Sequence, residues 1–167
     1  MVTGAKFAWG HALDFVRAQW LMLQQDEPED LVIATGIQHS VRQLCIKSFA
    51  FIGIDLEWQG KGIDEVGIIR HVKPTPVLEK YLKKLSINLP SPGTRVISID
   101  PGYFRPTEVD TLLGDASRAR EKLGWEPEIT FDQMISEMMN RDVLEAARET
   151  LCAQNGFVRP ESCESMM

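Results

Sequence analysis

Two side chains three residues apart, Arg105 and Glu108, have the chemistry to hold a phosphorylated sugar. A guanidinium can bind a phosphate through two parallel hydrogen bonds, and a nearby carboxylate can accept hydrogen bonds from vicinal sugar hydroxyls. Pro106 follows the arginine and restricts its backbone. The pair therefore predicts a site for a sugar nucleotide. The alternative is a surface turn in which Arg105 forms an ordinary weak ion pair.

The segment Ser40-Val41-Arg42 is a second candidate anion site, at the start of a predicted helix. Ser40 suits the N-cap position, where the amides of the first turn and the positive end of the helix dipole attract anions. Arg42 would add a full positive charge there. The alternative is a capped helix that carries an exposed arginine and binds no ligand.

No segment of the sequence matches a nicotinamide-dinucleotide site. Gly60 and Gly62 begin like the loop Gly-x-Gly-x-x-Gly, but its third glycine would fall on Glu65, whose charge would repel a pyrophosphate. Neither tyrosine has a lysine four residues later, the spacing that would suit a proton relay one helical turn apart. We therefore expect no catalytic residue in this chain and no cofactor bound to it alone.

The composition is that of one soluble globular domain, with 167 residues of which 44% are hydrophobic and 25% charged. A formal charge of -6 argues against a nucleic-acid partner. Three cysteines without Cys-x-x-Cys spacing, and three widely separated histidines, predict neither a metal site nor a disulfide framework. The sequence has no apolar run of about 20 residues and no signal peptide, which predicts a cytoplasmic protein without a membrane span.

Apolar periodicity and turn residues predict an α/β domain with few strands for its helices. Helices are expected at residues 10–25, 40–52, 76–85, 115–123 and from 130 to at least 144; strands are expected at residues 31–36, 54–58 and 96–100. The apolar run at 31–35 is typical of a strand buried on both faces of a parallel sheet. Gly60 and Gly62 begin an irregular region, and the tail after Gly156 is expected to be disordered. The last long helix is expected to bury six apolar residues, which are Met134, Ile135, Met138, Met139, Val143 and Leu144.

Seven blocks, in the same order, make the chain resemble the C-terminal half of the GDP-mannose 4,6-dehydratases, which are extended short-chain dehydrogenases/reductases. The blocks are Trp9-Gly10-His11-Ala12, Gln19 to Gln24, Val32 to Gly36, Ser40-Val41-Arg42, Tyr103 to Asp110, Leu112 to Asp115, and Lys122 to Pro127. The resemblance covers about residues 5–148 and is poor between about 62 and 95.

The resemblance implies a lyase that converts GDP-mannose to GDP-4-keto-6-deoxymannose, the precursor of GDP-fucose, with a tightly held NADP. It implies that residues 1–36 are the last helix and strand of a Rossmann-type NAD(P)-binding domain. Residues 37–150 would be the sugar-nucleotide-binding domain and residues 151–167 a disordered tail. The glycine-rich loop and the catalytic residues of that family are expected to precede residue 1.

By the same resemblance, Arg105 would contact the diphosphate and Glu108 the guanosine ribose, while Ser40, Val41 and Arg42 would border the substrate cleft. Two departures make this pocket less basic. The family has Arg-Asp before Trp-Gly where this chain has Phe7-Ala8, and an arginine at the position of Gly102. The loss of one charged hydrogen bond to a ligand typically costs about 1.5–3 kcal/mol.

Three hypotheses remain open from the sequence. The chain is a piece of a dehydratase that needs its other half, or a non-catalytic module that binds a sugar nucleotide or a protein, or a remnant with neither role. An apolar strand at residues 31–35 would expect strands on both edges and helices on both faces. We therefore expect self-association or a partner chain that completes the sheet.

Overall fold

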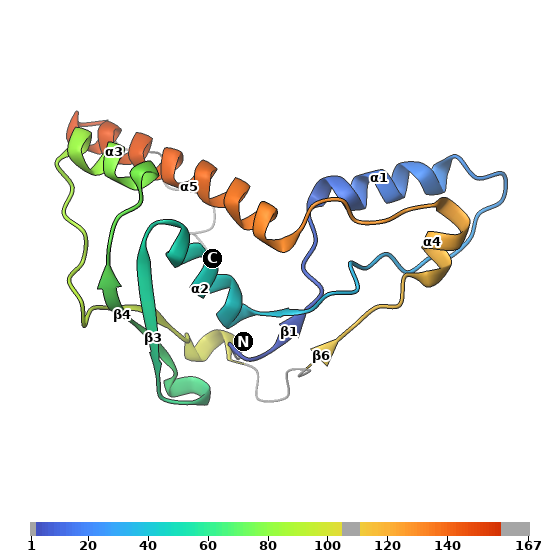
Figure 1. Cartoon of the computed structure of the whole chain (residues 1–167), viewed down its shortest axis with the longest axis horizontal. Coiled ribbons are helices and arrows are strands. Elements are labelled where there is room, and N and C mark those ends of the chain that lie inside the picture. The colour runs from blue at the N-terminus through green and yellow to red at the C-terminus, as the bar shows by residue number, and fades with distance from the viewer. Residues whose placement is uncertain (1–2, 105–110, 158–167) are drawn as a thin grey trace.

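The computed structural model describes residues 3–104 and 111–157, and it has the mixed α/β character that the sequence predicts (Figure 1). The strands are β1 (Lys6–Phe7), β2 (His39–Ser40), β3 (Ile54–Gln59), β4 (Val66–Val72), β5 (Arg95–Ser98) and β6 (Thr111–Leu112). The helices are α1 (Ala12–Leu23), α2 (Val41–Phe51), α3 (Pro76–Leu85), α4 (Ser117–Leu123) and α5 (Phe131–Gln154), with short 3-10 helices η1 (Gly62–Asp64) and η2 (Pro101–Tyr103).

Two small sheets hold the strands. In the larger sheet the order is β3-β4-β5 and all neighbours are antiparallel, so β3 is an edge strand as predicted. In the smaller sheet β1 lies between β2, which is antiparallel to it, and β6, which is parallel. This smaller sheet joins three distant parts of the sequence, and no periodicity predicted its two-residue strands.

At one end of the molecule α2 packs on β3 of the larger sheet and α5 packs on α2 and α3, while α1 packs on α4 at the other end (Figure 1). Both α2 and α5 begin with a capping box, formed by Ser40 with Gln43 and by Thr130 with Gln133. Each pair provides acceptors for two backbone N–H groups that have no partner within the helix. Because these bonds are local, the two helix starts could be predicted from the sequence. His11 caps α1, since its Nδ1 accepts a hydrogen bond from the Leu13 amide at 3.2 Å.

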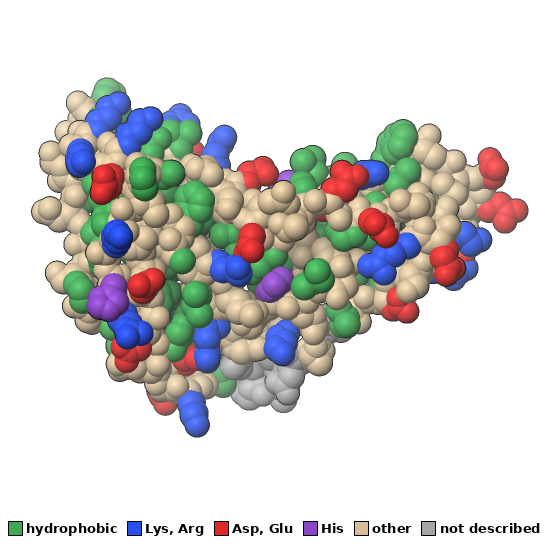
Figure 2. Space-filling view, viewed as in Figure 1, with side chains coloured by type: hydrophobic (Ala, Val, Ile, Leu, Met, Phe, Trp, Pro, Cys, Tyr) green, Lys and Arg blue, Asp and Glu red, His purple; other side chains and the backbone are tan. Residues whose placement is uncertain are grey.

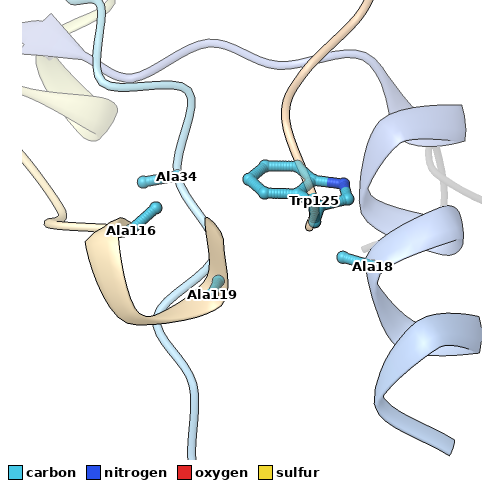
Figure 3. Packing of buried hydrophobic residues seen from close by; sticks show 5 residues of the cluster. All are labelled: Ala18, Ala34, Ala116, Ala119 and Trp125. Carbon is cyan, nitrogen blue, oxygen red and sulfur yellow. The ribbon is translucent and has the colours of Figure 1, made fainter. Parts of the chain in front are cut away.

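The best-buried cluster surrounds Trp125, whose side chain is fully shielded from solvent between α1 and α4. Figure 3 shows its indole directed between Ala18 on one side and Ala34, Ala116 and Ala119 on the other. The small side chains leave room for the ring, so the surrounding backbones can approach it closely. The indole N–H donates to the Asp14 carbonyl oxygen at 2.9 Å.

A buried carboxylate completes this cluster. Asp14 is 3% exposed, and its two carboxylate oxygens accept hydrogen bonds from the amides of Glu128 and Ile129, both at 3.1 Å. The turn after α4, where Gly124 has a φ of 60°, therefore leads directly into a segment bound to α1. The block from Lys122 to Pro127 thus has a structural role in this chain.

Several expectations about the elements were wrong. Residues 31–35 form no strand, because among the described residues no other strand lies along them to share a hydrogen-bond ladder, and the Val32 side chain is exposed. The expected irregular region after Gly62 contains β4, which is the central strand of the larger sheet. Met138 and Leu144 of α5 are exposed, whereas Met134, Ile135 and Val143 are buried as expected.

Helix α5 continues to Gln154, and residues 158–167 of the expected tail lie outside the described residues.

The apolar face of α1 is largely exposed, with Leu13, Val16, Trp20 and Leu23 all at least 57% accessible. Figure 2 shows hydrophobic side chains at the surface over this helix, while charges of both signs are scattered over the rest of that face.

Candidate functional site

Arg105 and Glu108, the first predicted ligand contacts, lie outside the described residues, but the chain on both sides of them is placed. Before them, Ser98 at the end of β5 pairs with Val66 at the start of β4. After them, Thr111 in β6 pairs with Lys6 in β1. Both flanks therefore lead to one region, in which the chain near residues 3–6 meets the start of β4.

The N-terminus of α2, the second predicted site, lies in the same region. The Val41 amide donates to the Ala5 carbonyl at 3.3 Å, and the Arg42 amide donates to the Thr3 carbonyl at 2.8 Å. The Gln43 amide donates to Ser40 Oγ at 3.1 Å. Because the first three amides of the helix already have acceptors, the side chain of Arg42 is the stronger donor that this helix start offers to an anion.

The guanidinium of Arg42 is held by three other side chains. Its Nη2 forms an ion pair with Glu65 Oε1, and its Nε and Nη2 lie 3.4 and 3.3 Å from Thr3 Oγ1. Thr3 Oγ1 also donates to Glu65 Oε2. On its face the guanidinium carbon lies 5.3 Å from the centre of the Trp58 ring, a cation–π contact.

The role of Glu65 was not predicted from the sequence. There its carboxylate is only an obstacle to a dinucleotide loop, whereas the structure buries it to 3% exposure beside Arg42. The two residues are 23 positions apart, so no local spacing connects them. The one available signal was that a carboxylate next to a buried strand must find a positively charged partner.

The segment around Gly60 and Gly62 does not fit the loop that binds a nicotinamide cofactor. Gly60 and Gly62 both have positive φ values, but they connect the antiparallel strands β3 and β4, not a strand to a helix whose N-terminus could bind the pyrophosphate. Glu65 occupies the third glycine position and its carboxylate is committed to Arg42. The prediction that this glycine motif is not a cofactor loop is therefore supported by its place in a hairpin.

The two positions at which the resemblance implies an arginine make local contacts in the structure. Phe7 packs edge-on against Trp9, with ring centroids 6.0 Å apart and planes at 76°. Trp9 in turn donates from Nε1 to the His39 carbonyl at 2.9 Å. Gly102 lies in an exposed turn and its amide donates to Asp100 Oδ1 at 2.8 Å. Neither position brings a positive charge to the site.

Beside this region is an aromatic hollow of about 280 Å³, which Trp9, His39 and Phe131 help to line. The rings of His39 and Phe131 are stacked, with centroids 3.9 Å apart and an interplanar angle of 6°. The stack joins β2 to the start of α5 and so supports the backbone next to Ser40. His11 and His39 thus serve capping and packing, as the sequence predicted for His11.

Residues 3–104 and 111–157 contain neither a metal cluster nor a membrane-spanning helix. This part of the chain contains no group of three or more histidine, cysteine, aspartate or glutamate side chains that could hold a metal ion. None of its helices is both long and apolar enough to cross a membrane.

The described residues thus form part of a mixed α/β protein in which Arg42 is ordered beside a helix N-terminus and no dinucleotide loop is found. Sequence comparison identifies the family of this protein. Residues 3–138 match the family described as GDP-mannose 4,6 dehydratase. The chain is 48% identical over 149 residues to a GDP-mannose 4,6-dehydratase of Vibrio cholerae, and 45% identical over 139 residues to that of Homo sapiens. The chain belongs to this family.

The comparison also shows how much of the family is represented. The matches cover 89% and 83% of this chain, but only 37% of the Vibrio cholerae protein and 32% of the human protein. The chain therefore spans about a third of the length of the curated relatives that it matches.

Proposed function

We propose that this chain is the sugar-nucleotide-binding part of a GDP-mannose 4,6-dehydratase and binds GDP-mannose or a closely related GDP-sugar. The observation that carries the proposal is the placement of Arg42. Its guanidinium is ordered in the region to which both flanks of the Arg105–Glu108 segment lead. A second arginine from that segment, together with Arg42, would suit a diphosphate.

Within this proposal Arg105 contacts the diphosphate and Glu108 accepts hydrogen bonds from the guanosine ribose. Arg42 supplies a second positive charge. Ser40 and Val41 border the cleft and fix the start of α2, because their own polar groups are used in the cap and in the bond to Ala5. Alone, this chain has no catalytic role in the proposal.

Conversion of GDP-mannose to the 4-keto-6-deoxy product would need the NADP site and the proton-transfer groups from another segment or chain. We infer that residues 1–36 belong to the edge of that Rossmann-type domain and residues 37–150 to the substrate-binding domain. Two observations support a covering partner: the exposed apolar face of α1, and residues 31–35, which have no pairing strand among the described residues. A second copy of this chain is the other candidate partner.

Calorimetric titration with GDP-mannose tests the binding proposal. We expect saturable binding with a Kd in the micromolar range for the folded chain, weakened about ten- to a hundredfold in Arg105→Ala by the loss of a charged hydrogen bond. Arg141→Ala, which removes an exposed arginine from α5, is the matched control and should leave the Kd unchanged. Equal affinity for wild type and Arg105→Ala would refute the assigned role.

A non-catalytic binding module is the second candidate function, favoured by Phe7 and Gly102 at positions where the resemblance implies arginines. The two candidates differ when the part of the Vibrio cholerae relative that this chain does not match is supplied together with NADP. The first predicts a 4-keto product from GDP-mannose. A soluble complex that holds NADP and GDP-mannose but yields no product would support the binding module.

A further inference from the structure

The carboxylate of Glu65 is more deeply buried than the arginine it binds. Its side chain is 3% exposed, whereas that of Arg42 is 43% exposed. A buried carboxylate is strongly unfavourable unless it is paired and hydrogen-bonded. Glu65 meets both conditions, because Oε1 binds Arg42 Nη2 and Oε2 accepts from the hydroxyl of Thr3.

The guanidinium is consequently fixed from one side. Nε and Nη2 face Thr3 and Glu65, and the ring of Trp58 lies against the flat face. Among the residues that the structure describes, Nη1 has no hydrogen-bond partner. With nearly half of the side chain exposed, an edge of the guanidinium is left open while its orientation is set.

We propose that Glu65 is a positioning residue that holds Arg42 with its free edge toward an anionic ligand, specifically the phosphates of a nucleoside diphosphate sugar. This inference rests on the proposed function for the identity of the ligand. Glu65 touches no ligand itself. Thr3 is the second member of the arrangement, since its hydroxyl bonds both to Glu65 and to the guanidinium of Arg42.

Simple electrostatics gives the opposite expectation, and this makes the inference easy to test. A negative carboxylate near a phosphate site lowers the positive potential there, so its neutralisation should tighten the binding of an anion. Positioning predicts weaker binding instead, because an arginine that is no longer held must be ordered by the ligand. The two explanations differ in the sign of the change.

The experiment is a double-mutant cycle by calorimetry with GDP-mannose, using wild type, Glu65→Gln, Arg42→Ala and the double variant. Glu65→Gln should weaken binding about tenfold, and the double variant should bind no more weakly than Arg42→Ala alone. Glu121→Gln, the same chemical change at an exposed position, should leave the affinity unchanged. Unchanged or tighter binding by Glu65→Gln would overturn the proposal.

Thr3→Val keeps Glu65 in place and serves if Glu65→Gln does not fold. This variant removes only the bridging hydroxyl, so it should weaken binding several-fold; an unchanged affinity would count against the arrangement.

A measurement without ligand separates this inference from the proposed function. In ¹⁵N-correlated NMR spectra the Nε–H signal of Arg42, identified by its loss in Arg42→Lys, should exchange slowly in wild type. In Glu65→Gln it should exchange rapidly. Loss of protection in a chain that binds no GDP-mannose would support positioning and contradict the proposed function. Protection that is unchanged in Glu65→Gln would refute positioning whatever the chain binds.

Discussion

Replacement of Asp14 by asparagine tests the packing that joins α1 to the segment after α4. The carboxylate of Asp14 is 3% exposed and accepts one hydrogen bond at each oxygen, from the amides of Glu128 and Ile129. Asparagine keeps the shape but has only one acceptor oxygen, so its NH₂ group would face a backbone N–H. The Trp125 indole would be unaffected, since it bonds to the backbone carbonyl of Asp14.

The size of the effect follows from these contacts. One charge-assisted hydrogen bond, worth about 1.5–3 kcal/mol, is lost and the other becomes neutral, which costs about 1 kcal/mol more. A negative charge in the first turn of α1 is also removed, at about 0.3–1 kcal/mol. The expected loss in the free energy of unfolding is therefore about 3–5 kcal/mol.

Urea unfolding followed by far-UV circular dichroism measures this loss. With an m-value of about 2 kcal/mol/M, the midpoint should fall by about 1.5–2.5 M. Asp26→Asn makes the same change at an exposed position just after α1 and should shift the midpoint by less than about 0.3 M. A midpoint for Asp14→Asn that matches this control would show that the two amide contacts do not stabilise the fold.

Two further predictions concern a turn and a thiol. Gly53 has a φ of 83°, and a Cβ there would lie 1.9 Å from the Lys73 carbonyl oxygen, so Gly53→Ala should cost more than about 2 kcal/mol. Gly62 has a φ of 59° but open space around it, so Gly62→Ala should cost only about 1 kcal/mol; equal midpoints in urea would contradict the argument from the clash. Burial raises the pKa of the Cys45 thiol, so in a Cys163→Ser background a disulfide reagent at pH 8 should modify exposed Cys152 about tenfold faster than Cys45. Equal reaction rates would contradict the burial of Cys45. Because the folded state favours the protonated Cys45 thiol, its contribution to the free energy of unfolding is present below the ordinary thiol pKa and is lost as pH rises through the raised pKa.

The elements that could be predicted from sequence are those with local signals. The capping residues Ser40 and Thr130 and the glycine after α4 mark helix ends through bonds that form within a few residues. Strand β4 was not predicted from the sequence because Gly67 interrupts its apolar pattern. In the structure Gly67 pairs with Ile97 at a register shift, and an added Cβ would come within 3.1 Å of that side chain.

The parts that could not be predicted depend on contacts between distant residues. The apolar run at 31–35 predicted a strand, but a strand also needs a neighbour to share its hydrogen bonds, and sequence periodicity cannot supply one. The cluster of Thr3, Arg42, Trp58 and Glu65 joins the chain near its start to α2, β3 and the residue before β4. The sequence shows the charged residues of this cluster, but it does not show which of them lie in contact.

The measurement closest to the central claim is the calorimetric titration of the folded wild-type chain with GDP-mannose. The account predicts saturable binding in the micromolar range, because Arg42 is already ordered in the region to which both flanks of the Arg105–Glu108 segment lead. A sample shown to be folded by circular dichroism that releases or absorbs no heat of binding at several temperatures would contradict it. The chain would then have kept the family's fold without a site that works on its own.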